Sequence, residues 1–347
     1  MSEATVSAGY AKALLDFAVR KGADEERLLQ RAGIDADALL DHDNRLPFVR
    51  FVDLMRGAKD MTGDPALALE FGADSDFRKW SVVGLISHAS ATMLEAAAQL
   101  NRYGKLVVEV DIVDDGPRFG QVAQDGEMWM VDRRANPNAF PELTESTWSR
   151  FICTARHDFP HATFALAAHV THPEPPYRSA YERLWQVPIT FNSTWNAIKV
   201  HPAWPMLKID GGNRYVFGVL AEKAEALLKE LEASKTERGR VESLLMPVLH
   251  TGEISMESIA AKLGVSRQTL YRNLKAEGVT FEQVLDELRH RMALDYLQAR
   301  KVSVNETAYL VGFSDPAAFS RAFKRWTGMS PREARGTGSR QPPTGSS

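Results

Sequence analysis

Residues 256–278 read MESIAAKLGVSRQTLYRNLKAEG and carry the pattern of two short helices joined by a tight turn. Apolar residues recur at helical spacing from Ile259 to Leu263, which predicts the buried stripe of a first helix. Gly264 can adopt the positive φ that ends a helix, and Ser266 can cap the helix that follows. This stretch therefore predicts a helix-turn-helix unit.

The second helix of this unit has a polar, basic outer face. Leu270 and Leu274 are spaced to face inward. The outer positions are Arg267, Gln268, Tyr271, Arg272 and Lys275. The major groove of DNA admits one helix, Arg and Gln can read base edges, and Arg and Lys can hold phosphates. We expect these five residues to contact double-stranded DNA.

Residues 304–335 carry the same pattern and read VNETAYLVGFSDPAAFSRAFKRWTGMSPREAR. Gly312 is placed at the turn, and Ser314 or Asp315 can cap the helix that follows. Pro316 falls in the first turn, where it costs no hydrogen bond. Small residues near the start of this helix would permit close approach to bases. The DNA contacts expected from this unit are Ala317, Ser320, Arg321 and Lys324.

A long helix is predicted between the two units, over Phe281–Arg300, preceded by Thr280. A helix of about 20 residues spans about 30 Å. That length is close to the roughly 34 Å between successive major-groove faces of a duplex. We therefore predict an all-α C-terminal domain, 241–335, in which a long helix joins two helix-turn-helix units.

The charge distribution supports this division of the chain. The net charge of −3 over 347 residues does not by itself indicate a nucleic-acid binder. Residues 240–335 contain 14 Lys and Arg against 11 Asp and Glu, a balance of +3. Residues 1–239 contain 27 against 34, a balance of −7. A mildly basic C-terminal region fits a local phosphate-binding surface, although charges of this size are common in domains.

The C-terminal region resembles the DNA-binding domain of the AraC/XylS family of bacterial activators. In the second unit the resemblance is carried by Gly312-Phe313, by FSRAFKR at 319–325 and by GMSP at 328–331 followed by Arg335. In the first unit it is carried by Ser266 and by LYRNLK at 270–275.

This resemblance implies that two helices enter adjacent major grooves and that Arg272, Arg321 and Lys324 contact DNA. It favours activation of transcription, which makes RNA polymerase an expected partner. Thr307 departs from the family pattern, because an aliphatic residue is usual at this position. That departure concerns core packing rather than the reading surface.

The first 233 residues mix helix and strand patterns and predict an α+β domain. Long helices are expected at Glu142–Phe159 and Asn213–Ala233. An Asp125-Gly126 hairpin turn is expected between two of the strands. The expected strands are Lys105–Asp114, Arg118–Gln124, Glu127–Arg133, Thr163–Thr171, Ile189–Phe191 and Ala197–Val200.

The polar segment 234–240 is interpreted as a linker between a domain at 1–233 and the domain at 241–335. Residues 336–347 are rich in Gly, Ser, Thr and Pro and predict a disordered tail. Neither a secretory signal nor an apolar run long enough to span a bilayer is evident. The single cysteine, Cys153, suits a reducing cytoplasm.

The N-terminal region is similar to an arabinose-binding-like, non-cupin sensor domain found in the AraC/XylS family. The similarity is carried by residues 84–103 and 172–200. It implies a domain that senses a small-molecule effector and mediates oligomerisation. Tyr and Trp would give an effector pocket apolar walls, and Arg would pair with a carboxylate. The candidate effector residues are Tyr103, Trp129, Arg133, Trp148 and Arg150, with core aromatics and surface arginines as the alternative interpretation.

An apolar stripe on the helix at 213–233 is a candidate seam for a homodimer. Its members are Val216, Leu220, Leu227 and Leu231. Packing of the same stripe onto its own domain is the alternative.

We expect no catalytic site, cofactor or metal. The sequence has no Gly-rich phosphate loop, nucleophile elbow or metal-ligand spacing. Cys153 and His157 lie four residues apart, but Pro160 breaks the helix before His161. The expected function is that of a DNA-binding transcription regulator, an activator that responds to an effector. The alternatives are a constitutive DNA-binding protein without effector and an enzyme domain fused to a DNA-binding module.

Overall fold

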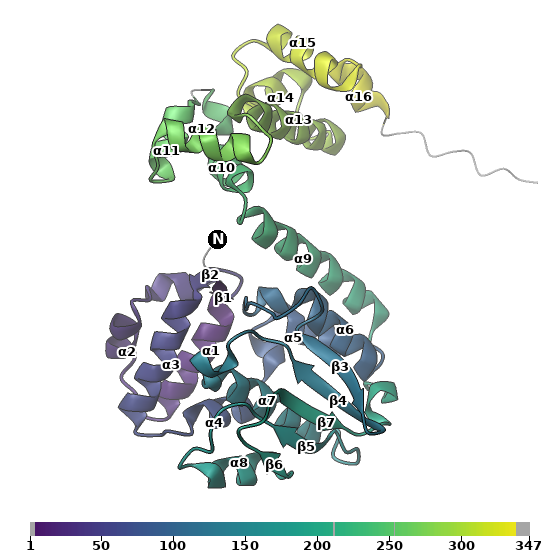
Figure 1. Cartoon of the computed structure of the whole chain (residues 1–347). Coiled ribbons are helices and arrows are strands. Elements are labelled where there is room, and N and C mark those ends of the chain that lie inside the picture. Colours follow the sequence, from purple (N-terminus) through teal and green to yellow (C-terminus); the bar gives the residue numbers. More distant parts are fainter. Residues whose placement is uncertain (1–3, 211, 253, 338–347) are drawn as a thin grey trace, which may run out of the picture. The chain divides into compact units, whose positions relative to one another are not determined.

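The computed structural model describes residues 4–210, 212–252 and 254–337, which divide into two compact units (Figure 1). One unit extends to Lys229, and the other begins at Glu230. Helix α9 (Arg214–Ala233) ends and helix α10 (Glu237–Leu245) begins close to this division. Residues 237–240 of the expected linker are therefore helical. The expected disordered tail lies outside the described residues except for 336 and 337, which end α16 (Pro331–Thr337).

The N-terminal unit begins with a small helical part around a stack of aromatic rings. Tyr10 stacks on Phe51, Phe71 and Trp80, with ring centroids 4.7, 5.7 and 4.9 Å away. The elements of this part are β1 (Thr5–Ser7), α1 (Ala8–Arg20), α2 (Glu25–Ala32), β2 (Arg45–Pro47), α3 (Phe48–Thr62) and α4 (Leu67–Asp74). Strands β1 and β2 pair antiparallel and were not predicted from the sequence.

A five-stranded sheet in the order β3-β4-β7-β5-β6 forms the second part of this unit. Strands β5 and β6 are parallel, and the other pairs are antiparallel. The bounds are β3 (Phe119–Gln124), β4 (Glu127–Asp132), β5 (Ala165–His169), β6 (Ile189–Thr190) and β7 (Asn196–Val200). The Asp125-Gly126 hairpin turn is confirmed, because Gln124 pairs with Glu127 across it. The mixed architecture predicted for this region is also confirmed.

The prediction of a strand at Lys105–Asp114 is wrong. Residues 104–106 form a 3₁₀ turn, and the segment that follows makes only isolated bridges, Val6 with Val108 and Ile112 with Arg134. The alternating sequence indicates extended backbone, but the segment passes from β1 to the end of β4 without a continuous partner.

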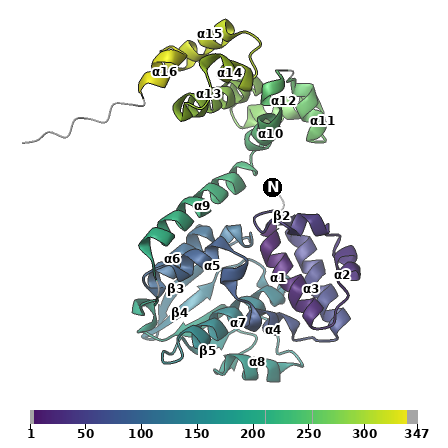
Figure 2. The ribbon, with the colours of Figure 1, turned by 180° about the vertical axis from the view of Figure 1, so that it is seen from behind.

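Helices cover one face of the sheet. Helix α7 packs its buried Trp148 into the same apolar cluster as Ile198 and Val200 of β7. Figures 1 and 2 show α5 and α6 next to β3 from both sides. The helices are α5 (Val82–His88), α6 (Met93–Tyr103), α7 (Pro141–Asp158) and α8 (Arg178–Trp185), with a 3₁₀ helix η2 (Phe77–Lys79) before α5 and η5 (Trp204–Met206) after β7. Among the described residues no helix combines the length and apolar character needed to cross a bilayer.

The C-terminal unit is all-helical, as predicted. One apolar cluster runs through it from Val241 of α10 to Phe323 of α15. The helices after α10 are the 3₁₀ helix η6 (Met246–Thr251), α11 (Met256–Lys262), α12 (Arg267–Ala276), α13 (Phe281–Ala299), α14 (Val304–Leu310), α15 (Pro316–Thr327) and α16. The predicted long helix is thus α13, which begins with a capping box between Thr280 and Gln283.

Candidate DNA-binding surface and effector cavity

Helices α11 and α12 form the first helix-turn-helix unit with the local features expected from the sequence. Gly264 has φ +70° at the turn. The Ser266 hydroxyl caps α12 by accepting a hydrogen bond from the Thr269 amide at 3.1 Å. Leu270 and Leu274 are buried in the core of the unit. Burial of these two positions fixes which side of α12 faces outward.

The outer side of α12 carries all five DNA contacts predicted for it, and all five side chains are exposed: Arg267, Gln268, Tyr271, Arg272 and Lys275. The Arg267 guanidinium pairs with the Glu257 carboxylate of α11, Nε to Oε1 at 2.6 Å. The Lys275 ammonium lies 6.0 Å from the centre of the Tyr271 ring. Both contacts are at the surface, so DNA phosphates can displace them at little cost.

Helix α15 holds the matching surface of the second unit. Asp315, rather than Ser314, caps it and accepts hydrogen bonds from the amides of Ala317 and Ala318, both at 3.0 Å. The predicted contacts Ala317, Arg321 and Lys324 are exposed. Ser320 is half-buried, and its hydroxyl donates to the Pro316 carbonyl at 2.9 Å. Reading a base with Ser320 would therefore require this bond to break.

The turn of the second helix-turn-helix unit is held at Gly312, which has φ +82°. A Cβ at this position would overlap the Leu249 carbonyl oxygen of η6. The Arg289 guanidinium of α13 donates to the Gly312 carbonyl at 3.4 Å and lies 5.0 Å from the centre of the Phe313 ring. Burial lowers the pKa of Arg289, against the attraction of Asp286. The second turn is thus packed against η6, which precedes the first helix-turn-helix unit, and against α13, which follows it.

Thr307 occupies a buried core position on α14. Its hydroxyl donates to the Ser303 carbonyl at 2.9 Å, one turn earlier in the chain. The polar group is therefore satisfied where it is buried. This bond accounts for how a threonine is accommodated at a position for which an aliphatic residue was expected.

A cavity of about 210 Å³ lies in the N-terminal unit between α5, α6, α7 and the covered face of the sheet. Most of its wall is apolar, with Met93 and Leu100 from α6, Met128 and Met130 from β4 and Trp204 from η5. A volume of this size far exceeds the roughly 10–15 Å³ that a single water requires. The cavity can therefore hold a small organic molecule.

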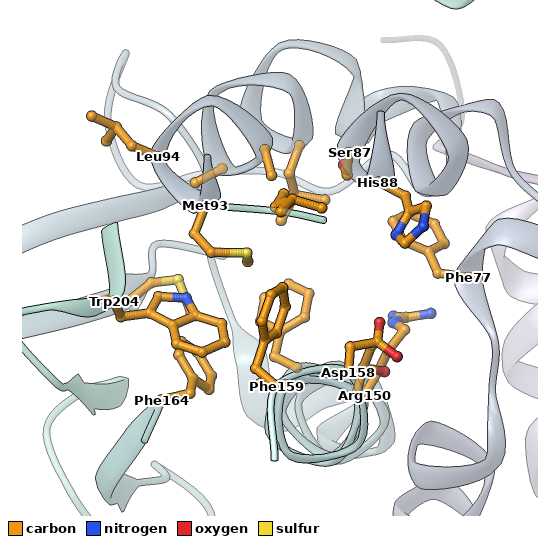
Figure 3. A pocket seen from close by; sticks show the side chains of 18 of the residues that line it. Phe77, Ser87, His88, Met93, Leu94, Arg150, Asp158, Phe159, Phe164 and Trp204 are labelled. Atoms are coloured by element: carbon orange, nitrogen blue, oxygen red, sulfur yellow. The ribbon is translucent and has the colours of Figure 1, made fainter. Parts of the chain in front are cut away.

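The charged residues of the cavity gather at one end. Figure 3 shows Arg150, Asp158 and Phe77 at that end, and Phe164 and Trp204 at the other. Arg78 pairs with Asp76 at 2.8 Å and approaches Asp158 at 3.7 Å. Arg150 is only 6% exposed, and its Nε and Nη1 atoms have no hydrogen-bond partner among the described residues.

The structure brings only one of the five candidate effector residues, Arg150, to this cavity. Trp129 packs on His169 and Trp195 in a separate cluster on the opposite face of the sheet. Tyr103 is buried, and its hydroxyl donates to Glu225 at 3.3 Å.

Arg133 pairs with Asp114 at 3.1 Å near the surface. Trp148 is fully buried against Phe119 and Phe151. Sequence reasoning missed the other cavity residues. The spacing of Arg150, Phe151, Thr154, Ala155 and Asp158 along one side of α7 is the signal that indicates a shared face.

Cys153 and the neighbouring histidines do not meet in one place. The Cys153 thiol donates to the Leu184 carbonyl at 3.4 Å, and burial raises its pKa. His157 pairs with Asp158, while His172 lies beside the Tyr181 hydroxyl. Among the described residues there is no group of three metal-ligating side chains close enough to hold an ion.

Comparisons with known proteins cover both units. Residues 22–209 match a family model described as the arabinose-binding domain of AraC transcription regulator, N-term, and residues 259–337 match a helix-turn-helix domain model. The chain is 27% identical over 334 residues to the ornithine utilization regulator of Pseudomonas aeruginosa, covering 95% of this chain and 96% of that protein.

It is also 38% identical over 84 residues to the transcriptional activator RhaS of Escherichia coli, covering 24% of this chain and 30% of that protein. Among solved structures, the transcriptional regulator CdpR from P. aeruginosa matches 92% of this chain and 98% of its own, with 21% identity and a TM-score of 0.42. The family match over residues 22–209 spans more than half of the chain. The chain therefore belongs to the AraC family of DNA-binding transcription regulators, with an arabinose-binding-type N-terminal domain.

Proposed function

We propose that this regulator reads DNA with α12 and α15 together and that a small molecule in the N-terminal cavity controls its binding. The observation that carries the proposal is the pair of exposed basic helices built on one continuous core. Among the described residues, Arg272 on α12 and Arg321 on α15 form no ion pair that would have to break before they meet phosphate. The 19-residue helix α13 is about 28 Å long, which is close to the distance between successive major grooves on one face of a duplex.

We further propose activation as the outcome, with RNA polymerase as the protein partner. Support comes from the DNA-binding region's similarity to RhaS, which is named an activator. We propose the cytoplasm as its site of action, because one cysteine cannot form an internal disulfide and suits a reducing compartment. We propose that the chain acts by binding and not by catalysis.

Self-association through α9 stays a prediction. Val216 of the predicted stripe is exposed, as are its neighbours Tyr215 and Val219. Leu231 is buried, and Leu220 and Leu227 are half-buried. The first turns of α9 thus present the apolar surface that a homodimer would cover, which sedimentation of the full chain can test.

The test of the proposal is a fluorescence-anisotropy titration of the full chain with DNA from upstream of its own gene. We expect salt-dependent binding that is lost when Arg272 and Arg321 are both changed to Ala, while Arg27→Ala, on the exposed surface of α2, keeps wild-type affinity. A metabolite panel that includes L-ornithine, after the name of the P. aeruginosa relative, then tests for an effector. Affinity unchanged by every compound would favour a constitutive DNA-binding protein.

A further inference from the structure

We infer that the N-terminal cavity binds a small amphipathic carboxylate, whose carboxylate pairs with Arg150 and whose apolar body extends toward Trp204. The inference rests on the proposed function, because it assigns a ligand class to the effector cavity. It is carried by three observations: an unpaired buried cation, the pairing of the nearby carboxylates, and the apolar character of the remaining wall.

Arg150 is a buried cation that lies against aromatic rings and pairs with no carboxylate among the described residues. Its guanidinium carbon lies 5.1 Å from the ring centre of Tyr10, 5.2 Å from that of Phe77 and 5.4 Å from that of Trp80. Three aromatic faces orient the guanidinium and partly offset its burial. They do not replace hydrogen bonds, and Nε and Nη1 have no acceptor among the described residues. An unpaired buried charge is costly, and a carboxylate accepts two parallel guanidinium bonds.

The acidic residues at the same end of the cavity already share one cationic partner, Arg78. Asp76 accepts two hydrogen bonds from the Arg78 guanidinium, at 2.8 and 3.3 Å. Asp158 faces Arg78 at 3.7 Å and the His157 ring at 2.8 Å. A ligand cation would therefore have to displace a protein cation, whereas a ligand anion would meet Arg150 directly. This end of the cavity consequently favours an anionic ligand.

The rest of the wall excludes a strongly polar ligand body. Phe159 and Met93 lie between the charged end and the end formed by Phe164 and Trp204 (Figure 3). A sugar would leave several hydroxyl groups without partners against these side chains, and each unsatisfied group weakens binding. The second ammonium of ornithine would face the same apolar wall. A carboxylate with a hydrocarbon or aromatic body satisfies both ends.

The test compares ligands that share one tail and differ in the head group: octanoate, 1-octanol and octylamine, titrated calorimetrically into the full chain. We expect octanoate to bind at least about tenfold more tightly than octanol, because a hydrogen bond to a charged group contributes about that much affinity. Arg150→Met should abolish this preference and leave octanol binding unchanged. Arg27→Met is the matched control and should behave as wild type, since Arg27 is exposed on α2 and outside the cavity lining.

Equal affinities for octanoate and octanol, or tighter binding of octylamine, would overturn the inference. If Arg150→Met does not fold, the relative affinities of octanoate, octanol and octylamine for the wild-type chain still test the inference. A DNA-binding measurement separates the two proposals. Octanoate that binds without changing DNA affinity supports the ligand class and contradicts effector control at this cavity. L-Ornithine that changes DNA affinity while octanoate fails to bind overturns the ligand class and leaves effector control standing.

Discussion

The two turn glycines, Gly264 and Gly312, make a matched pair for testing how the helix-turn-helix units are joined. Both have positive φ, +70° and +82°, so alanine at either position adopts a left-handed conformation that costs roughly 1–2 kcal/mol. A Cβ at Gly264 meets nothing within 4 Å. A Cβ at Gly312 overlaps the Leu249 carbonyl oxygen, and such overpacking typically adds about 1–3 kcal/mol.

We therefore expect Gly264→Ala to destabilise its unit by about 1–2 kcal/mol, and Gly312→Ala to destabilise its unit by about 2–5 kcal/mol. Hydrogen exchange in the full chain measures both, since amides of α11–α12 and of α14–α15 report local opening separately. Gly312→Ala should also accelerate exchange in η6, which supplies the clashing carbonyl. Equal effects of the two substitutions, or no change in η6, would refute the packing argument.

Three further predictions concern DNA contact, pH and assembly. Arg272→Ala or Arg321→Ala should each reduce the slope of log affinity against log salt by about 0.9 if the side chain holds a phosphate, or cost about 1–3 kcal/mol of discrimination at one base pair if it reads guanine. Titrations at several salt concentrations with specific and mutated DNA distinguish the two cases. No change in either quantity would exclude the residue from the DNA-binding surface. Burial raises the pKa of the Glu145 carboxyl, although hydrogen bonds from two tyrosine hydroxyls act to lower it. The stability of the fold should therefore fall as pH rises above the ordinary glutamate range, and Glu145→Gln should show a smaller fall in melting temperature between pH 5 and pH 8. The same pH profile in wild type and variant would contradict this. Val219→Lys should lower the sedimentation coefficient if α9 forms the dimer seam, and the same coefficient in wild type and variant would count against that seam.

The C-terminal unit was predictable because each of its signals is local. Caps at Ser266, Thr280 and Asp315 and positive φ at Gly264 and Gly312 are set by neighbouring backbone, so the sequence contains them directly. The outer face of α12 followed from the spacing of its buried leucines, Leu270 and Leu274. The sequence did not predict the contact of the second turn with η6, because it joins Leu249 and Gly312, which are 63 positions apart.

The cavity was not predictable to the same degree, because its walls come from distant segments. Trp129 was a reasonable wall residue by its chemistry, but side chains alternate along β4, so Met128 and Met130 face the cavity and Trp129 faces the other side. Helix α7 is buried almost all round, and its sequence alone does not tell which side borders an open space. The sequence shows the charge of Arg150, but only its surroundings show that its Nε and Nη1 atoms have no hydrogen-bond partner among the described residues.

The central claim is that α12 and α15 read one DNA duplex together, and hydroxyl-radical footprinting on a selected binding site tests it most directly. The expected pattern is two protected segments on one face of the duplex, centred about 10 base pairs apart. Arg272→Ala should weaken protection at one segment, and Arg321→Ala should weaken it at the other. A single protected segment, or two substitutions that weaken the same segment, would contradict simultaneous reading by the two helices.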